Sequence, residues 1–250
     1  MRSTNHEVNV VRNRAVGCEV AKISLALKDC AIVVCITTSI FAYLNKSNFA
    51  KKLLKLMFDT FRKYLEDKIV LTDQDYELIE SVSSFKKLRK RQYLLQAGDV
   101  GRFNAFVCKG FLRYYYVDEK GQEHIMQFAP ENYWTADRES MDSGMPSKYN
   151  IDAIEDSEIL LLKKEDFEMI RKTIPAFNNF VNETLKKNIA VLQQRIHVSI
   201  SFSAEEKYSN FISKYPSIGN RVPLHMIASY LGVSAETLSR IRSQISKKTV

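Results

Sequence analysis

The sequence predicts an α+β protein with an N-terminal β roll, a long helix after it and a helix-turn-helix at the C-terminus. Three patterns predict this order. Apolar residues alternate, with frequent turn residues, from about Lys87 to Leu162. They recur at a helical period over residues 175–199, and a Gly-Val-Ser turn joins two amphipathic stretches within residues 221–245. About six or seven short strands suit a roll of the double-stranded β-helix, cupin-like type.

Composition describes a globular chain and excludes disorder and collagen-like repeats, because 45% of its 250 residues are hydrophobic and only 26% are charged. The net charge of +8 is unevenly distributed. Residues 1–56 hold nine Lys/Arg against three Asp/Glu, residues 57–200 hold 21 against 23, and residues 201–250 hold seven against three. The body is nearly neutral and both ends are basic, so the overall charge is weak evidence for a nucleic-acid partner.

Residues 1–56 lack a clear amphipathic period, and we predict a poorly structured basic extension there, or a translation start assigned upstream of the native one. The 14-residue apolar run Ala31–Leu44 is shorter than the roughly 20 residues that span a bilayer. We therefore expect a cytoplasmic protein with no membrane partner. Helical spacing begins at Met57 and continues to residue 90, with Thr72 and Asp75 as a capping pair. The predicted domains are a β-roll domain over 57–174, a dimerisation helix over 175–199 and a helix-turn-helix domain over 200–250.

The long helix carries an apolar stripe that allows two interpretations. A helix of some 25 residues is about 37 Å long, which is long for a small domain. It either lies across its own β domain or forms the seam of a homodimer, in which a polar residue fixes the register. The predicted seam consists of Val181, Leu185, Asn188, Leu192 and Ile196.

The most specific pattern is RVPLHMIASYLGVSAETLSRIRSQI, residues 221–245. A first helix is expected from Leu224, Gly232 supplies a positive φ at the turn, and Ser234 caps a second helix. The apolar face of that second helix carries Leu238, Ile241 and Ile245. This arrangement is a helix-turn-helix, and its simplest alternative is an αα-hairpin packed in a core or against another protein.

The outer side of the second helix carries hydrogen-bonding side chains, which predicts a double-stranded DNA partner. The candidate DNA-binding residues are Ser234, Ala235, Glu236, Thr237, Ser239, Arg240 and Arg242. Arg240 suits a bidentate contact with guanine, and Glu236 can accept a hydrogen bond from cytosine. Ser234 and Thr237, at the helix start, suit phosphate oxygens.

This order of parts resembles the Crp/Fnr family of bacterial transcription regulators. The resemblance covers about residues 60–246 and is carried by LGVSAETLSRIR and by the strand-turn-strand GFLRYYYVDEKGQEHIMQF, residues 110–128. It implies a cyclic-nucleotide-binding-type domain, a winged helix-turn-helix and a homodimeric regulator that reads DNA. RNA polymerase and an unidentified small-molecule effector are further candidate partners. Glu236 and Arg240 would occupy base-reading positions, whereas Ala235 departs from members that carry Arg there, which leaves the target sequence open.

Family members that bind cyclic nucleotide hold the ribose and phosphate with a Gly-Glu pair and a later Arg. Thr135-Ala136 and Ser147-Lys148 stand in the corresponding stretch, so we expect no cAMP binding and no cofactor. The candidate effector pocket consists of Trp134, Thr135, Ala136, Ser147 and Lys148. Packing of Trp134 in the core of the roll is the alternative.

One branch of the family holds an iron–sulfur cluster with four cysteines. Cys18, Cys30, Cys35 and Cys108 match that number but not the tight spacing, and the four histidines are scattered. We therefore expect no metal site, and the absence of catalytic motifs predicts a protein that is not an enzyme. The alternative function is a ligand-sensing or protein-interaction module whose helix-turn-helix no longer reads DNA.

Overall fold

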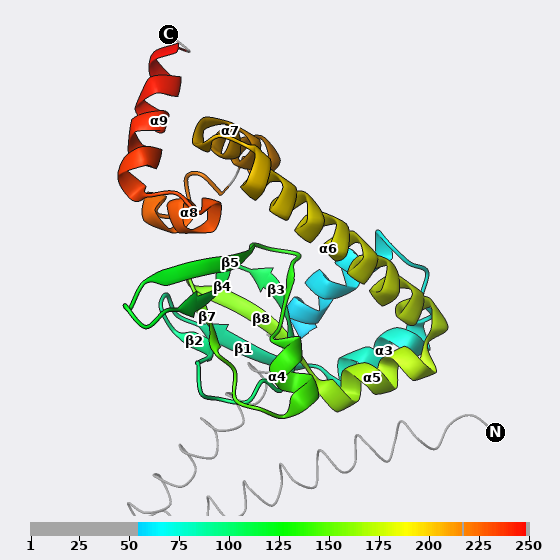
Figure 1. The fold of residues 1–250 in the computed structure, drawn as a ribbon. Coiled ribbons are helices and arrows are strands. Elements are labelled where there is room, and N and C mark those ends of the chain that lie inside the picture. The colour runs from blue at the N-terminus through cyan, green and yellow to red at the C-terminus, as the bar shows by residue number, and fades with distance from the viewer. Residues whose placement is uncertain (1–54, 217, 249–250) are drawn as a thin grey trace, which may run out of the picture. The chain divides into compact units, whose positions relative to one another are not determined.

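The computed structural model describes residues 55–216 and 218–248, which belong to one unit, Leu54–Val250 (Figure 1). The extension predicted over residues 1–56, its start-site hypothesis and the apolar run Ala31–Leu44 lie outside the described residues, apart from the last two positions. Within the described ranges, every helix is too short or too polar to span a bilayer.

Two helical segments precede the roll. Residues 55–66 are helical, and α3 (Asp73–Val82) follows. The predicted cap is confirmed, because the Thr72 side chain accepts a hydrogen bond from the Asp75 backbone N–H while the Asp75 carboxylate accepts from that of Thr72. The helix then ends at Val82, earlier than the helical spacing suggested.

Eight strands in the described chain form two four-stranded antiparallel sheets with the orders β1-β8-β3-β6 and β2-β7-β4-β5. The strands are β1 (Ser84–Leu88), β2 (Tyr93–Leu95), β3 (Phe103–Lys109), β4 (Leu112–Val117), β5 (Glu123–Ala129), β6 (Trp134–Thr135), β7 (Tyr149–Ala153) and β8 (Ser157–Lys163). Neighbours within each sheet are mostly distant in sequence, as expected of a roll.

The helix predicted from the sequence to residue 90 is wrong over Ser84–Leu88, which is a strand. This segment forms β1, with Ser84 opposite Leu161 and Leu88 opposite Ser157 on β8. Pairing with β8 satisfies its backbone groups, and the side chain of Leu88 is buried in the roll. The short β6 and α4 (Arg138–Ser143) were not predicted either.

The roll encloses an apolar core between its sheets. On β4, Leu112 and Tyr114 pack with this inner cluster, whereas Tyr115 packs with the cluster on the other face of the strand. The buried members of the inner cluster are Leu88, Ala105, Val107, Leu112, Ala129, Ile151, Ala153, Ile159 and Leu161.

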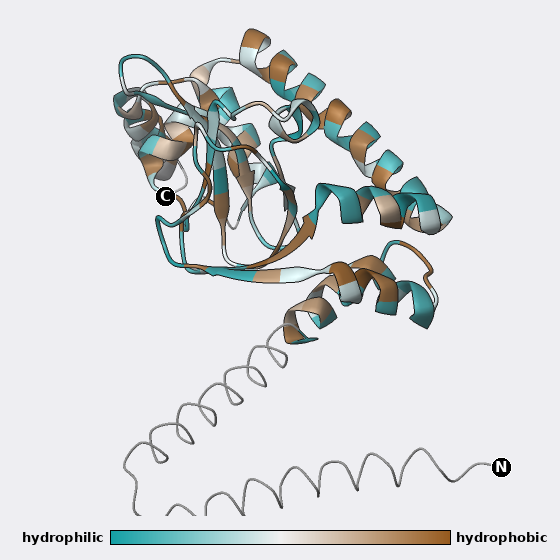
Figure 2. Ribbon diagram, turned by 90° about the horizontal axis from the view of Figure 1, so that it is seen from below, coloured by the Kyte–Doolittle hydropathy of each residue, from teal (hydrophilic) through white to brown (hydrophobic). Residues whose placement is uncertain are grey.

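The second half of the described chain is helical. It contains α5 (Lys164–Thr173), α6 (Pro175–Ser201), α7 (Ala204–Lys214), α8 (Leu224–Leu231) and α9 (Ala235–Lys248). The long predicted helix is confirmed as α6, and Figure 2 shows hydrophobic and hydrophilic residues alternating along it. All described strands precede α5, so residues 164–216 and 218–248 contain no strand that could form a wing.

The helices of the C-terminal region pack on the outer face of the second sheet. Their side chains form one buried cluster with side chains of the roll, and α8 lies along β5 (Figure 1). The roll contributes Phe111, Tyr115, Ile125, Phe128 and Ile154, and the helical region contributes Phe211, Ile218, Val222, Ile227, Ala228 and Leu238.

Candidate nucleic-acid interface

The turn between α8 and α9 has the geometry that the sequence predicted. Gly232 ends α8 in the left-handed conformation, with φ of 66°, and its N–H donates to the carbonyls of Ala228 and Ser229. Two residues later, the Ser234 hydroxyl accepts a hydrogen bond of 3.1 Å from the Thr237 backbone N–H and caps α9. These contacts fix the angle at which α9 leaves the turn.

The inner sides of the two helices hold them together. Ile227 and Ala228 on α8 are buried, as are Leu238 and Ile241 on α9. Leu238 is fully inaccessible to solvent. The predicted apolar face is therefore confirmed, with Ile245 half-buried at its far end.

The opposite side of α9 is open to solvent. Glu236 and Arg240 are both exposed and lie one turn apart on the same face. Ser234, Ser239 and Arg242 are also exposed, and Ala235 and Thr237 are half-buried. The structure thus leaves most of the predicted DNA-binding side chains accessible.

Electrostatics leave this face charged. Hydrogen bonds lower the pKa of Glu236, first from its own backbone N–H and then from the Ser234 hydroxyl, so Glu236 is an anionic acceptor at neutral pH. Arg240 and Arg242 form no ion pair with any residue that the structure describes. Both guanidinium groups are available to base edges or phosphates.

The predicted dimer seam is only partly exposed along α6. Val181 is turned toward its own chain and is 5% exposed, and Leu185 is half-buried. Asn188, Leu192 and Ile196 are exposed. Ile189 and Ile200, which were not part of the predicted seam, extend this exposed face. The exposed apolar stripe consists of Ile189, Leu192, Ile196 and Ile200, with exposures of 56%, 56%, 60% and 79%.

The five residues proposed as an effector pocket are not brought together around one cavity. Trp134 packs against Phe61, Phe106 and Phe167 at ring-centroid distances of 5.4, 5.3 and 5.9 Å. This contact ties the helical segments to the outside of β3, so Trp134 is a packing residue. Its neighbour Thr135 is buried within β6, opposite Ala105 of β3.

The other proposed pocket residues have separate surroundings. Ala136 is half-buried, and Lys148 is exposed, 3.8 Å from the Glu139 carboxylate. Ser147 is buried, and its hydroxyl donates a hydrogen bond of 2.6 Å to the Asp137 carboxylate. The place assigned to a phosphate-binding side chain is therefore occupied by an internal Ser–Asp contact.

A cleft of about 280 Å³ does open into the roll, and none of those five residues lines it. Its walls are formed by Leu94, Leu95, Asp99, Val100, Gly101, Arg102, Phe103, Asp137 and Ile151. Asp137 is 4% exposed and caps α4 through the Ser140 backbone N–H. The wall therefore holds the carboxylates of Asp99 and Asp137 together with the guanidinium of Arg102.

Cys108 is buried in the roll, and burial raises the pKa of its thiol to about 12, so it is an unreactive side chain at neutral pH. The other three cysteines lie outside the described residues. Within the described ranges, no group of three His, Cys, Asp or Glu residues is placed to hold a metal ion.

Two residues that sequence reasoning missed tie the helix-turn-helix to the roll. The Ser229 hydroxyl on α8 accepts a hydrogen bond from the Ile125 N–H and donates to the Glu123 carbonyl, both on β5. Arg221, in the loop before α8, contacts two glutamates of the roll. A lone Ser and a lone Arg carry no sequence pattern that reveals such contacts.

The roll matches a known domain family, and most of the chain is similar to two regulatory proteins. Residues 85–173 match the family model of the cyclic nucleotide-binding domain. The regulatory protein HlyX of Actinobacillus pleuropneumoniae is 25% identical over 191 residues, which cover 71% of this chain and 78% of HlyX. An anaerobic regulatory protein of Pasteurella multocida is 24% identical over 189 residues, 71% of this chain and 68% of that protein.

Solved structures show the same fold. FixK2 from Bradyrhizobium japonicum aligns with a TM-score of 0.59 at 18% identity, over 68% of this chain and 87% of FixK2. A Crp/Fnr-family protein from Eubacterium rectale aligns with a TM-score of 0.56 at 18% identity, over 71% of this chain and 85% of that protein.

Proposed function

We propose that this chain, like the regulators of the Crp/Fnr family that it resembles, is a homodimeric transcription regulator that reads a specific DNA sequence with α9. The observation that carries this proposal is the division of α9 into a buried apolar face and an exposed face with Glu236 and Arg240 one turn apart. Such a helix enters the major groove with its N-terminal residues at the base edges. Arg240 would contact guanine, and the hydroxyl of Ser234 would contact phosphate.

The exposed apolar stripe on α6 supports the dimer. Four large aliphatic side chains on one helix face remain open to water in the single chain, and a second copy of α6 would cover them. A symmetric dimer presents two copies of α9 and therefore favours an inverted repeat in the DNA.

The roll contributes a sensor domain that does not bind cAMP in this proposal. Asp137 places a buried carboxylate in the wall of the cleft, and Ser147 is already hydrogen-bonded to it. Arg102 supplies one positive charge to the wall, but the carboxylates of Asp99 and Asp137 lie in the same wall and oppose a cyclic phosphate. Calorimetric titration with cAMP and cGMP should give no saturable heat, and micromolar binding of either nucleotide would contradict this part of the proposal.

Selection of bound duplexes from a random pool tests the DNA-binding function. We expect an inverted repeat with half-sites about one helical turn apart. Arg240→Ala should cost about 1–3 kcal/mol at one base pair in each half-site and relax the preference there. Arg242→Ala is the matched control, because a phosphate contact should weaken all sequences alike and reduce the salt slope by about one per subunit.

Three possible results of this selection would each contradict a different part of the proposal. An Arg240→Ala variant with the wild-type preference at every position would refute the assignment of Arg240. An asymmetric single site would refute the dimer geometry. Absence of any salt-dependent DNA binding would favour the protein-interaction module instead.

A further inference from the structure

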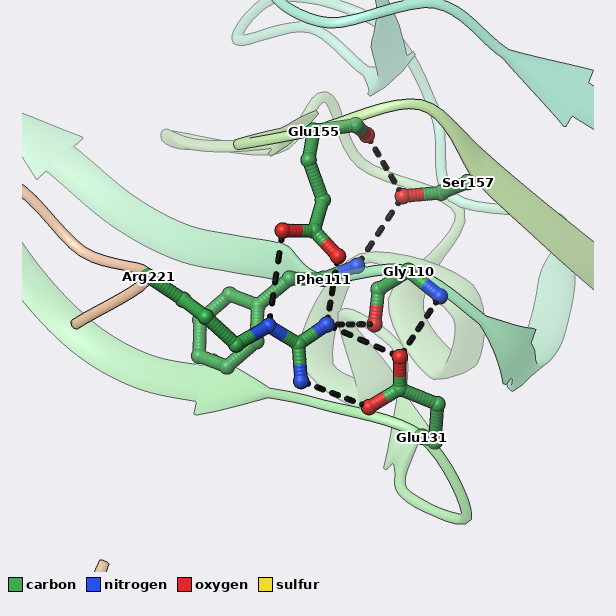
Figure 3. A network of polar contacts seen from close by, with 6 residues as sticks. All are labelled: Gly110, Phe111, Glu131, Glu155, Ser157 and Arg221. Atoms are coloured by element: carbon green, nitrogen blue, oxygen red, sulfur yellow. Dashed lines mark hydrogen bonds and ion pairs between the residues drawn. The ribbon is translucent and has the colours of Figure 1, made fainter. Parts of the chain in front are cut away.

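Arg221 lies in the loop between α7 and α8 and inserts its guanidinium between acidic loops of the roll (Figure 3). Its two terminal nitrogens each lie 2.8 Å from a different carboxylate oxygen of Glu131. The same guanidinium donates to the carboxylate of Glu155 and, at 3.3 Å, to the carbonyl of Gly110. It also lies over the ring of Phe111, 5.1 Å from the ring centroid. Arg221 is thus enclosed by three separate loops of the roll.

The roll fixes these acceptors through its own hydrogen bonds, and we call the set Glu131, Glu155 and Gly110 the arginine socket. The Gly110 N–H donates to Glu131 at 2.9 Å. Ser157 Oγ accepts from the Phe111 N–H and donates to the Glu155 carbonyl. Gly110 has φ of +96°, and a Cβ there would lie 2.3 Å from Ser157 Oγ, so only glycine fits.

The two carboxylates of the arginine socket depend on the positive charge of Arg221. The socket presents two carboxylates to one guanidinium, and all three side chains are partly buried. Burial alone would raise the pKa of Glu131, but the hydrogen bonds from Arg221 and from backbone N–H groups hold it below its ordinary value. Without Arg221, two carboxylates would face each other beside the apolar contact between the roll and the helix-turn-helix.

The docked arrangement leaves the reading face of α9 free. Leu238 lies in the cluster that joins the helical region to the roll, whereas Glu236 and Arg240 on the other side of α9 are exposed. Docking therefore fixes the orientation of α9 without covering the side chains that would contact bases.

We propose that Arg221 is a positioning residue, which holds the helix-turn-helix on the roll so that the two copies of α9 in a dimer engage both half-sites of an inverted repeat together. This inference rests on the proposed DNA-binding function. Simultaneous engagement multiplies the affinity of two linked modules only when their geometry permits it. We call the contact between Arg221 and the arginine socket the latch. Loss of the latch should therefore weaken binding to a full site far more than binding to a half-site.

The experiment compares the full-length dimers of wild type, Arg221→Gln and Glu155→Gln on a selected inverted repeat and on one isolated half-site. We expect Arg221→Gln to lower full-site affinity about 10-fold or more while half-site affinity changes less than about 2-fold. Glu155→Gln should show the same split, with a smaller loss. Arg62→Gln is the matched control, since Arg62 also contacts two carboxylates, Glu66 and Asp73, far along the chain from the latch.

Three outcomes would overturn the proposal: unchanged affinity for both DNAs, an equal loss on both, or tighter binding by the variant. If the wild type binds no DNA, that result refutes the proposed function and not the latch. Hydrogen exchange of backbone amides then tests the latch without DNA. The Ile125 amide donates to Ser229 across the docked surface, so Arg221→Gln should speed its exchange. The amides that pair β3 with β8 should be unaffected, and an unchanged Ile125 rate would refute the latch itself.

Discussion

A glutamate in place of Leu192 should separate the dimer. Leu192 is 56% exposed in the single chain, and complete burial of a leucine stabilises by about 1.5–3 kcal/mol, so covering the remaining surface contributes about 0.8–1.7 kcal/mol. Symmetry doubles this to about 1.7–3.4 kcal/mol, which corresponds to a roughly 20- to 300-fold weaker dimer dissociation constant. Repulsion between two carboxylates at the seam adds to that loss.

Sedimentation equilibrium over a range of concentrations measures the effect directly. The wild type should be a dimer at micromolar concentration, and Leu192→Glu should shift the midpoint of association by at least the factor above. Lys187→Glu is the matched control, because Lys187 is exposed on the opposite side of α6 and changes charge without touching the apolar stripe. A monomeric wild type, or an unchanged midpoint for Leu192→Glu, would refute the reasoning.

Three further predictions concern stability. Leu238→Ala should destabilise the C-terminal helices by about 2–5 kcal/mol, measured by chemical denaturation, because Leu238 is fully buried; a cost near zero would contradict its role. Gly110→Ala should lower the melting temperature measurably, since its Cβ would clash with Ser157 Oγ, while Gly121→Ala, in open space at a similar positive φ, should cost less. The lowered pKa of Glu131 stabilises the fold at neutral pH, and this contribution should fade as pH falls below the ordinary value of 4.5, a loss that Glu131→Gln should abolish.

The elements that the sequence predicted well are those whose own residues determine them. The caps at Thr72 and Ser234 are local hydrogen bonds between residues three positions apart, and the turn at Gly232 needs only one residue that tolerates positive φ. The same holds for the buried face of α9, which follows from helical spacing.

The features that the sequence did not predict depend on contacts with distant segments of the chain. Ser84–Leu88 is a strand because it pairs with β8, about 70 positions later in the chain, and no local pattern carries that information. Trp134 and Ser147 were assigned to a pocket by analogy of position, whereas their partners Phe61 and Asp137 were not predictable from spacing. Arg221 likewise meets Glu131 only because the fold brings loops 90 positions apart together.

The packing of Trp134 has a spectroscopic consequence. It is the only tryptophan in the chain, and its ring lies in the aromatic cluster with Phe61, Phe106 and Phe167. Its intrinsic emission therefore reports the environment of the roll. The far-ultraviolet circular dichroism of the chain, by contrast, includes all of α6 to α9. Recording both signals along one denaturation curve would show whether the two halves lose structure in one cooperative step or in two.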